Sequence, residues 1–227
     1  LQHCDGQSHV LASTVPNCRA YDPAFAYEMA VIVRDGIKRM YGDEPEDCFY
    51  YLTLYNENYT MPLMPEGVED GILRGLYRYR GVRGERRHRA QILASGTAVR
   101  SAVIAQQFLL DEHDVAADVW SAPSYKLLRE DALSVERWNR LHPEAKAPRK
   151  PWVTQQLEGR SGPAIAATDY VRHFANQVRE YVPMRYSVLG TDGYGRSDTR
   201  ANLRRHFEVD RFHVAHAAVA ALAADGK

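Results

Sequence analysis

The sequence lacks the features that mark a nucleic-acid-binding or membrane protein. Its 29 lysine and arginine residues are matched by 29 aspartate and glutamate residues, so the formal net charge is zero. Without an excess of positive charge, the chain has no long-range attraction for nucleic acids or anionic membrane surfaces. No apolar run approaches the roughly 20 residues that a membrane-spanning helix needs. We therefore expect a small molecule or another protein, rather than nucleic acid or membrane, as the partner.

Cysteine is scarce as well. The chain has three cysteines, Cys4, Cys18 and Cys48, and their spacing matches no zinc-binding pattern. No secretory signal segment is visible either. Reduced thiols in a cytoplasmic protein are the expected state.

The sequence begins without methionine, in a polar run over residues 1–9 that contains glycine, two histidines and an aspartate. Runs of this kind usually lie between ordered elements that hold their side chains in place. We therefore expect the chain to be a fragment of a longer protein.

The sequence does contain a regular alternation of strand-like and helix-like segments. Strands are expected at residues 48–54, 91–94, 117–120, 164–167 and 187–189. Helices are expected at residues 97–110, 125–141, 171–181, 201–207 and 212–222. Strands that alternate with helices of this length predict an α/β fold with a mostly parallel sheet covered by helices on both faces.

An earlier helix and the connector after it divide the chain. Asp22 and Pro23 are expected to cap and open a helix whose apolar residues recur until Gly42. Residues 55–67 then form an irregular run whose two prolines, three positions apart, favour an extended connector. We expect a domain boundary there, with residues 1–66 in one domain and residues 67–227 in the next.

Two loops have compositions that could bind an anion, but their patterns favour a structural role. Residues 190–198 carry the spacing G-x-x-G-x-G, which is neither the dinucleotide fingerprint nor a P-loop. A tight turn, followed by a helix that Ser197, Asp198 or Thr199 caps, is expected. The basic cluster at residues 81–89 has no interleaved aromatic residues and is expected to be a solvated loop.

Two sets of histidines are candidates for a functional site. His206, His213 and His216 lack the HExxH arrangement and a nearby cysteine, and are expected to be ordinary helix residues. His3 is followed at short range by Asp5, a pattern that suits a general acid or base with an orienting carboxylate. Asp-Gly is also a common turn dipeptide, so the residues alone leave both roles open.

Several separated motifs together resemble one family. They are LQHxDGxSH at residues 1–9, YDPAFAYE at 21–28, NENY with MP and MPEG at 56–67, DVWS at 118–121, and the glycine loop that continues through SDTR toward residues 206–207. In this order they closely resemble the homodimeric decarboxylating subunit of bacterial pyruvate dehydrogenase complexes, a branch of the transketolase superfamily. The resemblance covers essentially the whole chain.

The resemblance implies an enzyme that uses thiamine diphosphate and magnesium to decarboxylate pyruvate. The acetyl unit would pass to a lipoyl group on a partner, the dihydrolipoyl acetyltransferase. Residues 1–66 would end the pyrimidine-binding domain of a cytoplasmic homodimer, and residues 67–227 would form its carboxy-terminal domain. The family's cofactor ligands, and the glutamate that activates the aminopyrimidine, would lie upstream of Leu1. We therefore expect the 227-residue chain alone to be inactive.

One catalytic residue of the family carries over to this chain. The histidine of the family's Leu-Gln-His motif aligns with His3, which the resemblance places beside the thiazolium ring and the substrate. Its imidazole would donate a hydrogen bond to the oxyanion or carboxylate of the pyruvate adduct and handle protons during acetyl transfer. Asp5 is the candidate for orienting this loop. Cys4 and Gln7 stand where the family commonly has an acidic residue and a histidine, which bears on pairing within the loop.

Two other functions remain open from the sequence. The parent could be another thiamine enzyme of the same fold, either an oxoglutarate decarboxylating subunit or a transketolase. It could also be a non-catalytic module for dimerisation or docking. The motifs at residues 1–6 and 56–67 favour the pyruvate enzyme, and the retained His3 argues against a purely structural parent.

Overall fold

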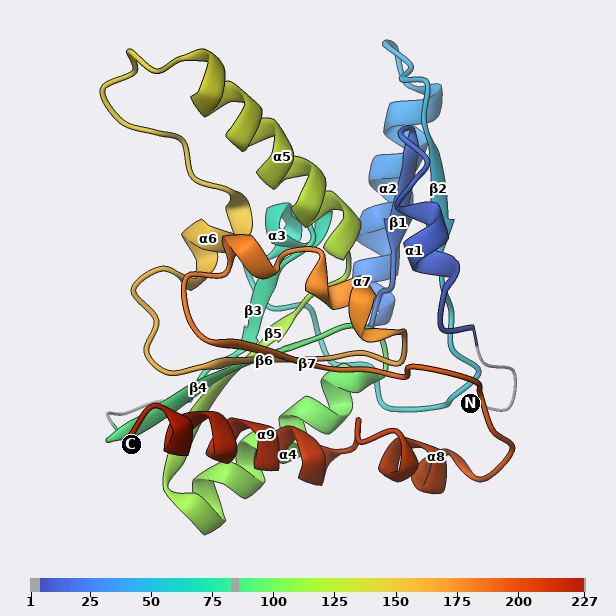
Figure 1. Cartoon of the computed structure of the whole chain (residues 1–227). Helices are drawn as coiled ribbons and strands as arrows, with labels where there is room; N and C mark the ends of the chain where they lie inside the picture. The colour runs from blue at the N-terminus through green and yellow to red at the C-terminus, as the bar shows by residue number, and fades with distance from the viewer. Residues whose placement is uncertain (1–4, 83–85, 227) are drawn as a thin grey trace.

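Two β-sheets organise the chain in the computed structural model, which describes residues 5–82 and 86–226 (Figure 1). The smaller sheet pairs two parallel strands, β1 (Cys18–Tyr21) and β2 (Phe49–Leu52). The larger sheet has the strand order β3-β5-β4-β6-β7. Its strands are β3 (Tyr77–Arg80), β4 (His88–Ala94), β5 (Val115–Ser121), β6 (Ala164–Ala167) and β7 (Tyr186–Leu189). Only edge strand β3 runs antiparallel to its neighbour among the described residues, so the predicted mostly parallel sheet is confirmed.

Helices cover both faces of the larger sheet (Figure 1). The helices are α1 (Ser8–Ala12), α2 (Ala26–Tyr41), α3 (Glu69–Arg74), α4 (Ala98–His113), α5 (Tyr125–Leu141), α6 (Trp152–Leu157), α7 (Arg172–Asn176), α8 (Arg200–His206) and α9 (Arg211–Ala224), with a 3-10 turn at Arg179–Tyr181. α4 and α9 pack on one face, while α5, α6 and α7 pack on the other. Within the described part of the chain, no helix is both long and apolar enough to cross a membrane.

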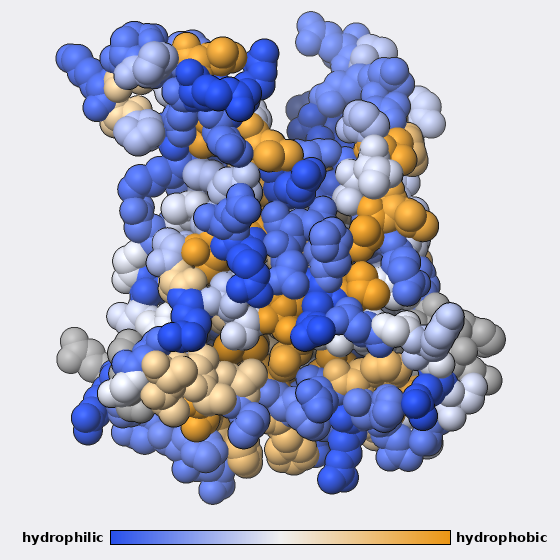
Figure 2. All heavy atoms as spheres, viewed as in Figure 1, coloured by the Kyte–Doolittle hydropathy of each residue, from blue (hydrophilic) through white to orange (hydrophobic). Residues whose placement is uncertain are grey.

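The central strands show why the sheet needs both layers of helices. Along β4, Ala90 and Ile92 face the α4 and α9 layer, whereas Leu93 faces the α5 and α7 layer. A strand that is buried on both faces has to be apolar at nearly every position. The buried Gln91 is the exception, and its side-chain oxygen accepts a hydrogen bond from Trp120 Nε1 at 2.9 Å. The face seen in Figure 2 is mostly hydrophilic, with pale orange residues along α9.

Two expected helices differ from the structure. The helix expected over residues 171–181 is shorter, because α7 ends at Asn176 and a separate 3-10 turn follows. The guanidinium of Arg179 donates to Asn176 Oδ1 at 3.1 Å and to the Tyr186 carbonyl at 2.7 Å. These bonds fasten the turn to β7 and break the regular helix.

The expected cap of the first long helix is also wrong. α2 begins at Ala26 rather than directly after the Asp-Pro pair at 22–23. The Glu28 carboxylate accepts the backbone N–H of Phe25 at 3.3 Å at the start of this helix. Asp22 is instead fully buried and accepts hydrogen bonds from distant segments. Tertiary partners have displaced the local capping role that the sequence suggested.

The smaller sheet is joined to the larger one by buried hydrogen bonds. The Ser124 hydroxyl, at the start of α5, donates to the Ala20 carbonyl in β1 at 2.6 Å. The Ser121 hydroxyl, at the end of β5, donates to Glu28 in α2 at 2.6 Å. The backbone N–H of Asp22 donates to the Pro123 carbonyl at 2.7 Å. The carboxyl ends of strands from both sheets therefore meet in one region.

Candidate functional site

The amino-terminal loop lies against the carboxyl end of β6. Asp5 Oδ1 accepts the backbone N–H of Ser8 at 2.9 Å, and its other oxygen accepts the Ser8 hydroxyl. The buried Gly6 carbonyl accepts the backbone N–H of Val171 at 3.0 Å, just before α7. His3 and Cys4 lie outside the described residues, so the structure gives no geometry for the predicted catalytic histidine. The structure does describe the following residues of this loop, Asp5 and Gly6, and the hydrogen bonds that hold them.

His9 lies buried directly behind this loop, in α1. Its ring packs against Tyr170 and Phe174, with centroid distances of 4.7 and 4.9 Å, and its Nε2 lies 2.9 Å from Thr53 Oγ1. Burial lowers the pKa of His9 to about 4, although the nearby charge of Asp5 acts in the opposite direction. The imidazole is therefore neutral at pH 7.

The hydrogen bond between Thr53 and Asp22 bears on which ring nitrogen of His9 carries the proton. When Asp22 is ionised, the Thr53 hydroxyl donates to its Oδ1 at 2.8 Å, and the Thr53 oxygen then accepts the N–H of His9 Nε2. His9 Nδ1 then carries no proton, and it has no hydrogen-bond partner among the described residues.

Asp22 ends this line of hydrogen bonds. Tyr55 Oη donates to its second oxygen at 3.2 Å. Burial raises the pKa of Asp22 to about 7, while hydrogen bonds from Ser95, Thr53 and Tyr55 lower it and the charge of Asp169 raises it further. A carboxyl group with such a pKa is partly protonated at neutral pH.

The topology explains why these residues meet. Asp22 follows β1, Thr53 follows β2, Ser95 follows β4 and Thr168 follows β6. The Ser95 and Thr168 hydroxyls lie 3.2 Å apart. Parallel strands bring their carboxyl ends to one edge, which is where ligands bind in open α/β sheets. We call Asp22, Thr53, Ser95, Thr168 and His9 the polar junction.

The polar junction was not predicted from the sequence. Asp22 was expected only as a helix cap, and no separate role was expected for His9. One signal was available, because Asp22 comes directly after the short segment CRAY at residues 18–21, and Thr53 comes directly after the aromatic-rich segment FYYL at residues 49–52. β1 has only four residues and was not predicted, so the first of these positions could not be recognised.

The other candidate residues have structural roles. His213 Nδ1 lies 2.8 Å from Asp210 Oδ1, which caps α9, while His206 and His216 are exposed. Residues 190–198, where a tight turn was predicted, form an irregular segment that bends at Gly193, whose φ is 81°. The predicted cap of the next helix is confirmed, because the Thr199 hydroxyl accepts the N–H of Asn202.

The described residues do not include a metal site. No group of three or more histidine, cysteine or acidic side chains within residues 5–82 and 86–226 could hold a metal ion.

Two family models match successive parts of the sequence. Residues 1–62 match the middle domain of the pyruvate dehydrogenase E1 component. Residues 75–210 match the transketolase-like C-terminal domain. The chain belongs to the transketolase-like family.

Within this family, the chain is similar over its whole length to pyruvate dehydrogenase E1 components. That of Pseudomonas aeruginosa is 53% identical over 227 residues, which cover 100% of this chain and 26% of the relative. That of Escherichia coli strain K12 is 49% identical over 228 residues, covering 100% of this chain and 25% of the relative. The chain therefore spans about a quarter of the length of these relatives. The resemblance inferred from the motifs is confirmed.

Solved structures support the fold of this transketolase-like chain. Transketolase from Leishmania mexicana superposes with a TM-score of 0.66 at 18% sequence identity, covering 95% of this chain and 27% of that one. At this identity the likeness concerns the fold alone. The predicted transketolase-like α/β architecture is confirmed.

The opposed pKa shifts in the polar junction give a testable pH dependence. The pKa of His9 is about 4 when folded, against an ordinary 6.5, so the unfolded segment binds the extra proton between these values. Its contribution to stability is therefore present above about pH 6.5 and is lost as the pH falls toward 4. The raised pKa of Asp22 has the opposite sign, because the folded state holds the extra proton between its ordinary 3.8 and about 7.

We expect His9→Phe, in the full-length protein, to reduce the loss of local stability between pH 7 and pH 5 by about 2 kcal/mol. Phenylalanine keeps the ring packing and cannot be protonated, while Thr53 keeps its bond to Asp22. Hydrogen exchange of peptides that cover α1, corrected for intrinsic rates at each pH, measures the effect. His216→Phe on the exposed face of α9 is the matched control. An unchanged pH dependence in His9→Phe would show that His9 is not buried in its neutral form.

Proposed function

We propose that this chain is the carboxy-terminal part of a thiamine diphosphate-dependent pyruvate dehydrogenase E1 component. The whole protein oxidatively decarboxylates pyruvate and transfers the acetyl group to the lipoyl group of a dihydrolipoyl acetyltransferase. The observation that carries the proposal is identity of 53% over the whole chain to an E1 component, with two family models matched in succession.

The proposal divides the chain near residue 66. Residues 1–66 complete the pyrimidine-binding domain, and residues 67–227 form the carboxy-terminal domain. The matched ranges of the family models, 1–62 and 75–210, support this division. The run without regular structure between β2 and α3 also supports it.

Within the proposed site, this chain contributes the loop that carries His3. When bound, thiamine diphosphate supplies the nucleophilic carbon that adds to the keto group of the substrate. The His3 imidazole donates a hydrogen bond to developing negative charge on the substrate and exchanges protons with it. The bond from Val171 N–H to the Gly6 carbonyl holds the base of the loop, and the Asp5 carboxylate fixes the turn into α1.

The proposal also specifies the assembly. The protein is a cytoplasmic homodimer that binds magnesium with thiamine diphosphate and docks the dihydrolipoyl acetyltransferase. The family resemblance places the magnesium ligands upstream of this chain. The 227-residue chain alone is accordingly inactive.

The test uses the full-length protein supplied with thiamine diphosphate and magnesium. We expect reduction of an artificial electron acceptor with pyruvate as substrate, and little or none with 2-oxoglutarate at the same concentration. The 227-residue chain assayed alone serves as a control and should give no turnover. A preference for 2-oxoglutarate, or no reduction with either oxoacid, would contradict the proposed substrate.

A further inference from the structure

A strongly basic pocket lies between α4, α8 and α9. Its volume is about 1070 Å³. Five arginine side chains from these three helices line it: Arg100, Arg200, Arg204, Arg205 and Arg211. The acidic residues in its lining are Glu57 and Asp210. Five positive charges against two negative ones leave a formal excess of three, in a chain whose net charge is zero.

One carboxylate already occupies the inner end of the pocket. Glu57 accepts from Arg100 and Arg204, each at 2.9 Å, and lies 4.0 Å from Arg200. Burial raises the pKa of Glu57, but the hydrogen bond and charge of Arg204 outweigh it, together with the charges of Arg100 and Arg200, and the pKa is lowered. Glu57 therefore stays ionised and marks this end as a place where an anion is stable.

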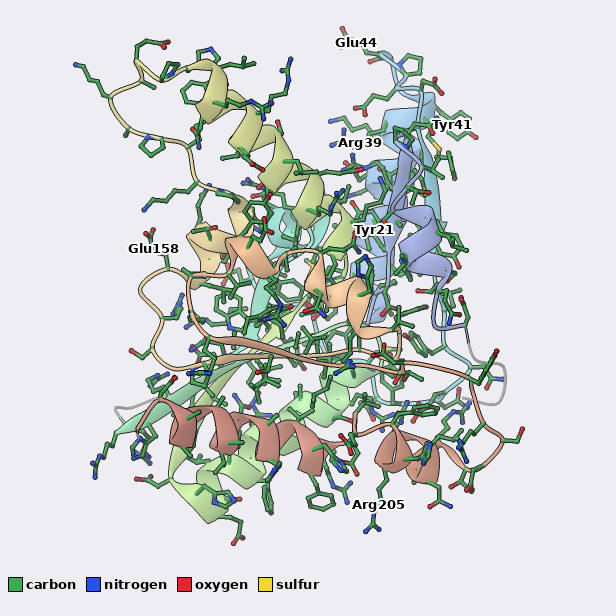
Figure 3. The ribbon with its side chains drawn as sticks, viewed as in Figure 1. Tyr21, Arg39, Tyr41, Glu44, Glu158 and Arg205 are labelled. Atoms are coloured by element: carbon green, nitrogen blue, oxygen red, sulfur yellow. The ribbon has the colours of Figure 1, made fainter. Side chains whose placement is uncertain are left out.

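The outer end of the pocket has guanidinium groups that no carboxylate neutralises. Within the described ranges, neither Arg205 nor Arg211 has an ion pair with an acidic side chain. Figure 3 shows Arg205 extending from α8 away from the rest of the protein. The Arg200 side chain is 56% exposed, and its bond to the Asn56 carbonyl at 2.6 Å uses one nitrogen. Asp210 is engaged by His213 and by backbone N–H groups of α9.

Guanidinium groups recognise phosphate and carboxylate oxygens through paired N–H donors, and their charge is fixed at all physiological pH values. A phosphate group brings more negative charge per group than a carboxylate, which suits an excess of three positive charges. Ile104 and Phe212 line the same pocket and are about half exposed, so an apolar surface adjoins the arginines. We propose that this pocket binds a small organic molecule that carries a diphosphate, held by Arg200, Arg205 and Arg211.

This inference does not depend on the proposed activity. The pocket's arginines belong to α4, α8 and α9, whereas the base of the amino-terminal loop is bonded to Val171, just before α7. Glu57 belongs to the connector between the two sheets, and Arg200 holds the backbone of the same connector at Asn56. A ligand on Arg200 would thus contact the segment that joins the two parts of the chain.

The test is calorimetric titration of the full-length protein after it has been loaded with thiamine diphosphate, so that any diphosphate site for the cofactor is filled. The probes are ADP, pyrophosphate and citrate. We expect saturable binding of ADP that is tighter than that of pyrophosphate, because the organic group adds contact with Phe212 and Ile104. Binding of pyrophosphate as tight as that of ADP would overturn the organic part of the proposal. Citrate binding equal to pyrophosphate binding would overturn the choice of phosphate.

The variant Arg205→Gln/Arg211→Gln should weaken ADP binding by about tenfold or more, because two charge-assisted contacts are lost. The matched control is Arg137→Gln/Arg140→Gln, which removes the same charge from exposed positions of α5 on the opposite face of the sheet. Equal weakening in both variants would indicate a general charge effect and overturn the site. Pyruvate turnover of the same preparations is measured in parallel, so the inference and the proposed function can fail separately.

Discussion

Replacing His3 by alanine in the full-length protein is expected to lower pyruvate-dependent turnover by about 10²- to 10⁴-fold, the usual contribution of a positioned acid or base. The expectation rests on the match of the LQHxDGxSH motif and on the proposed function. The imidazole would act on charge that develops during the reaction, so kcat should fall more than KM rises. Steady-state kinetics with an artificial electron acceptor measure both constants.

Two comparisons separate a catalytic role of His3 from a structural one. His216→Ala removes an exposed histidine from α9 and should leave turnover unchanged. Hydrogen exchange of α1 and α7 in His3→Ala should match wild type, because Gly6 and Asp5 keep their backbone contacts. Turnover within about threefold of wild type would remove His3 from the mechanism, since even modest catalytic groups contribute more than this.

Gly162→Ala is expected to destabilise the larger sheet by about 3 kcal/mol or more, since a left-handed backbone strains alanine and the added carbon has no room. Gly162 has a φ of 88°, and a Cβ there would lie 1.6 Å from the Arg89 carbonyl oxygen. That oxygen belongs to the backbone of β4, so it cannot move aside alone. Gly162 lies in the loop between α6 and β6. This loop is also bonded to β4, because the backbone N–H of Gln91 donates to the Pro163 carbonyl at 2.9 Å.

Gly159 in the same loop supplies a matched control. It also has a left-handed φ, 74°, but nothing lies within 4 Å of the position that a Cβ would take. Gly159→Ala should therefore show the backbone strain alone, about 1 kcal/mol. Hydrogen exchange of peptides from β4 and β6 in the full-length protein should accelerate about 100-fold in Gly162→Ala and about fivefold in Gly159→Ala. Equal effects would mean that the close approach to β4 is absent.

Much of the architecture could be predicted because local pattern and tertiary burial agree in it. The bounds expected for α5 and β6 match those observed, and the strands expected at 91–94 and 117–120 form the buried centre of the larger sheet. Apart from Gln91 and Asp118, their residues are apolar, as expected of a strand between two helix layers. The short edge strand β3 was missed, although its alternating Tyr-Arg-Tyr-Arg sequence has the period of a half-buried strand.

The candidate site could be predicted only where it is contiguous in sequence. The loop motif with His3 and Asp5 was recognised because its residues are neighbours. The polar junction was not, because His9 lies 44 positions from Thr53, and Thr53 lies 31 positions from Asp22. The arginine pocket was missed for the same reason, since its charges come from three helices and each helix alone resembles an ordinary solvated surface.

The sequence by itself determined the family, the alternation of strands and helices, and the balance of charge that argued against a generally basic surface. These properties depend on residue type and local spacing, which the chain carries before it folds. Only the tertiary structure decided that Asp22 is a buried acceptor with a raised pKa rather than a helix cap, and that a neutral chain concentrates five arginines around one pocket. Both results depend on removing side chains from water and bringing distant segments together, and the free energy of a charge is set by those surroundings.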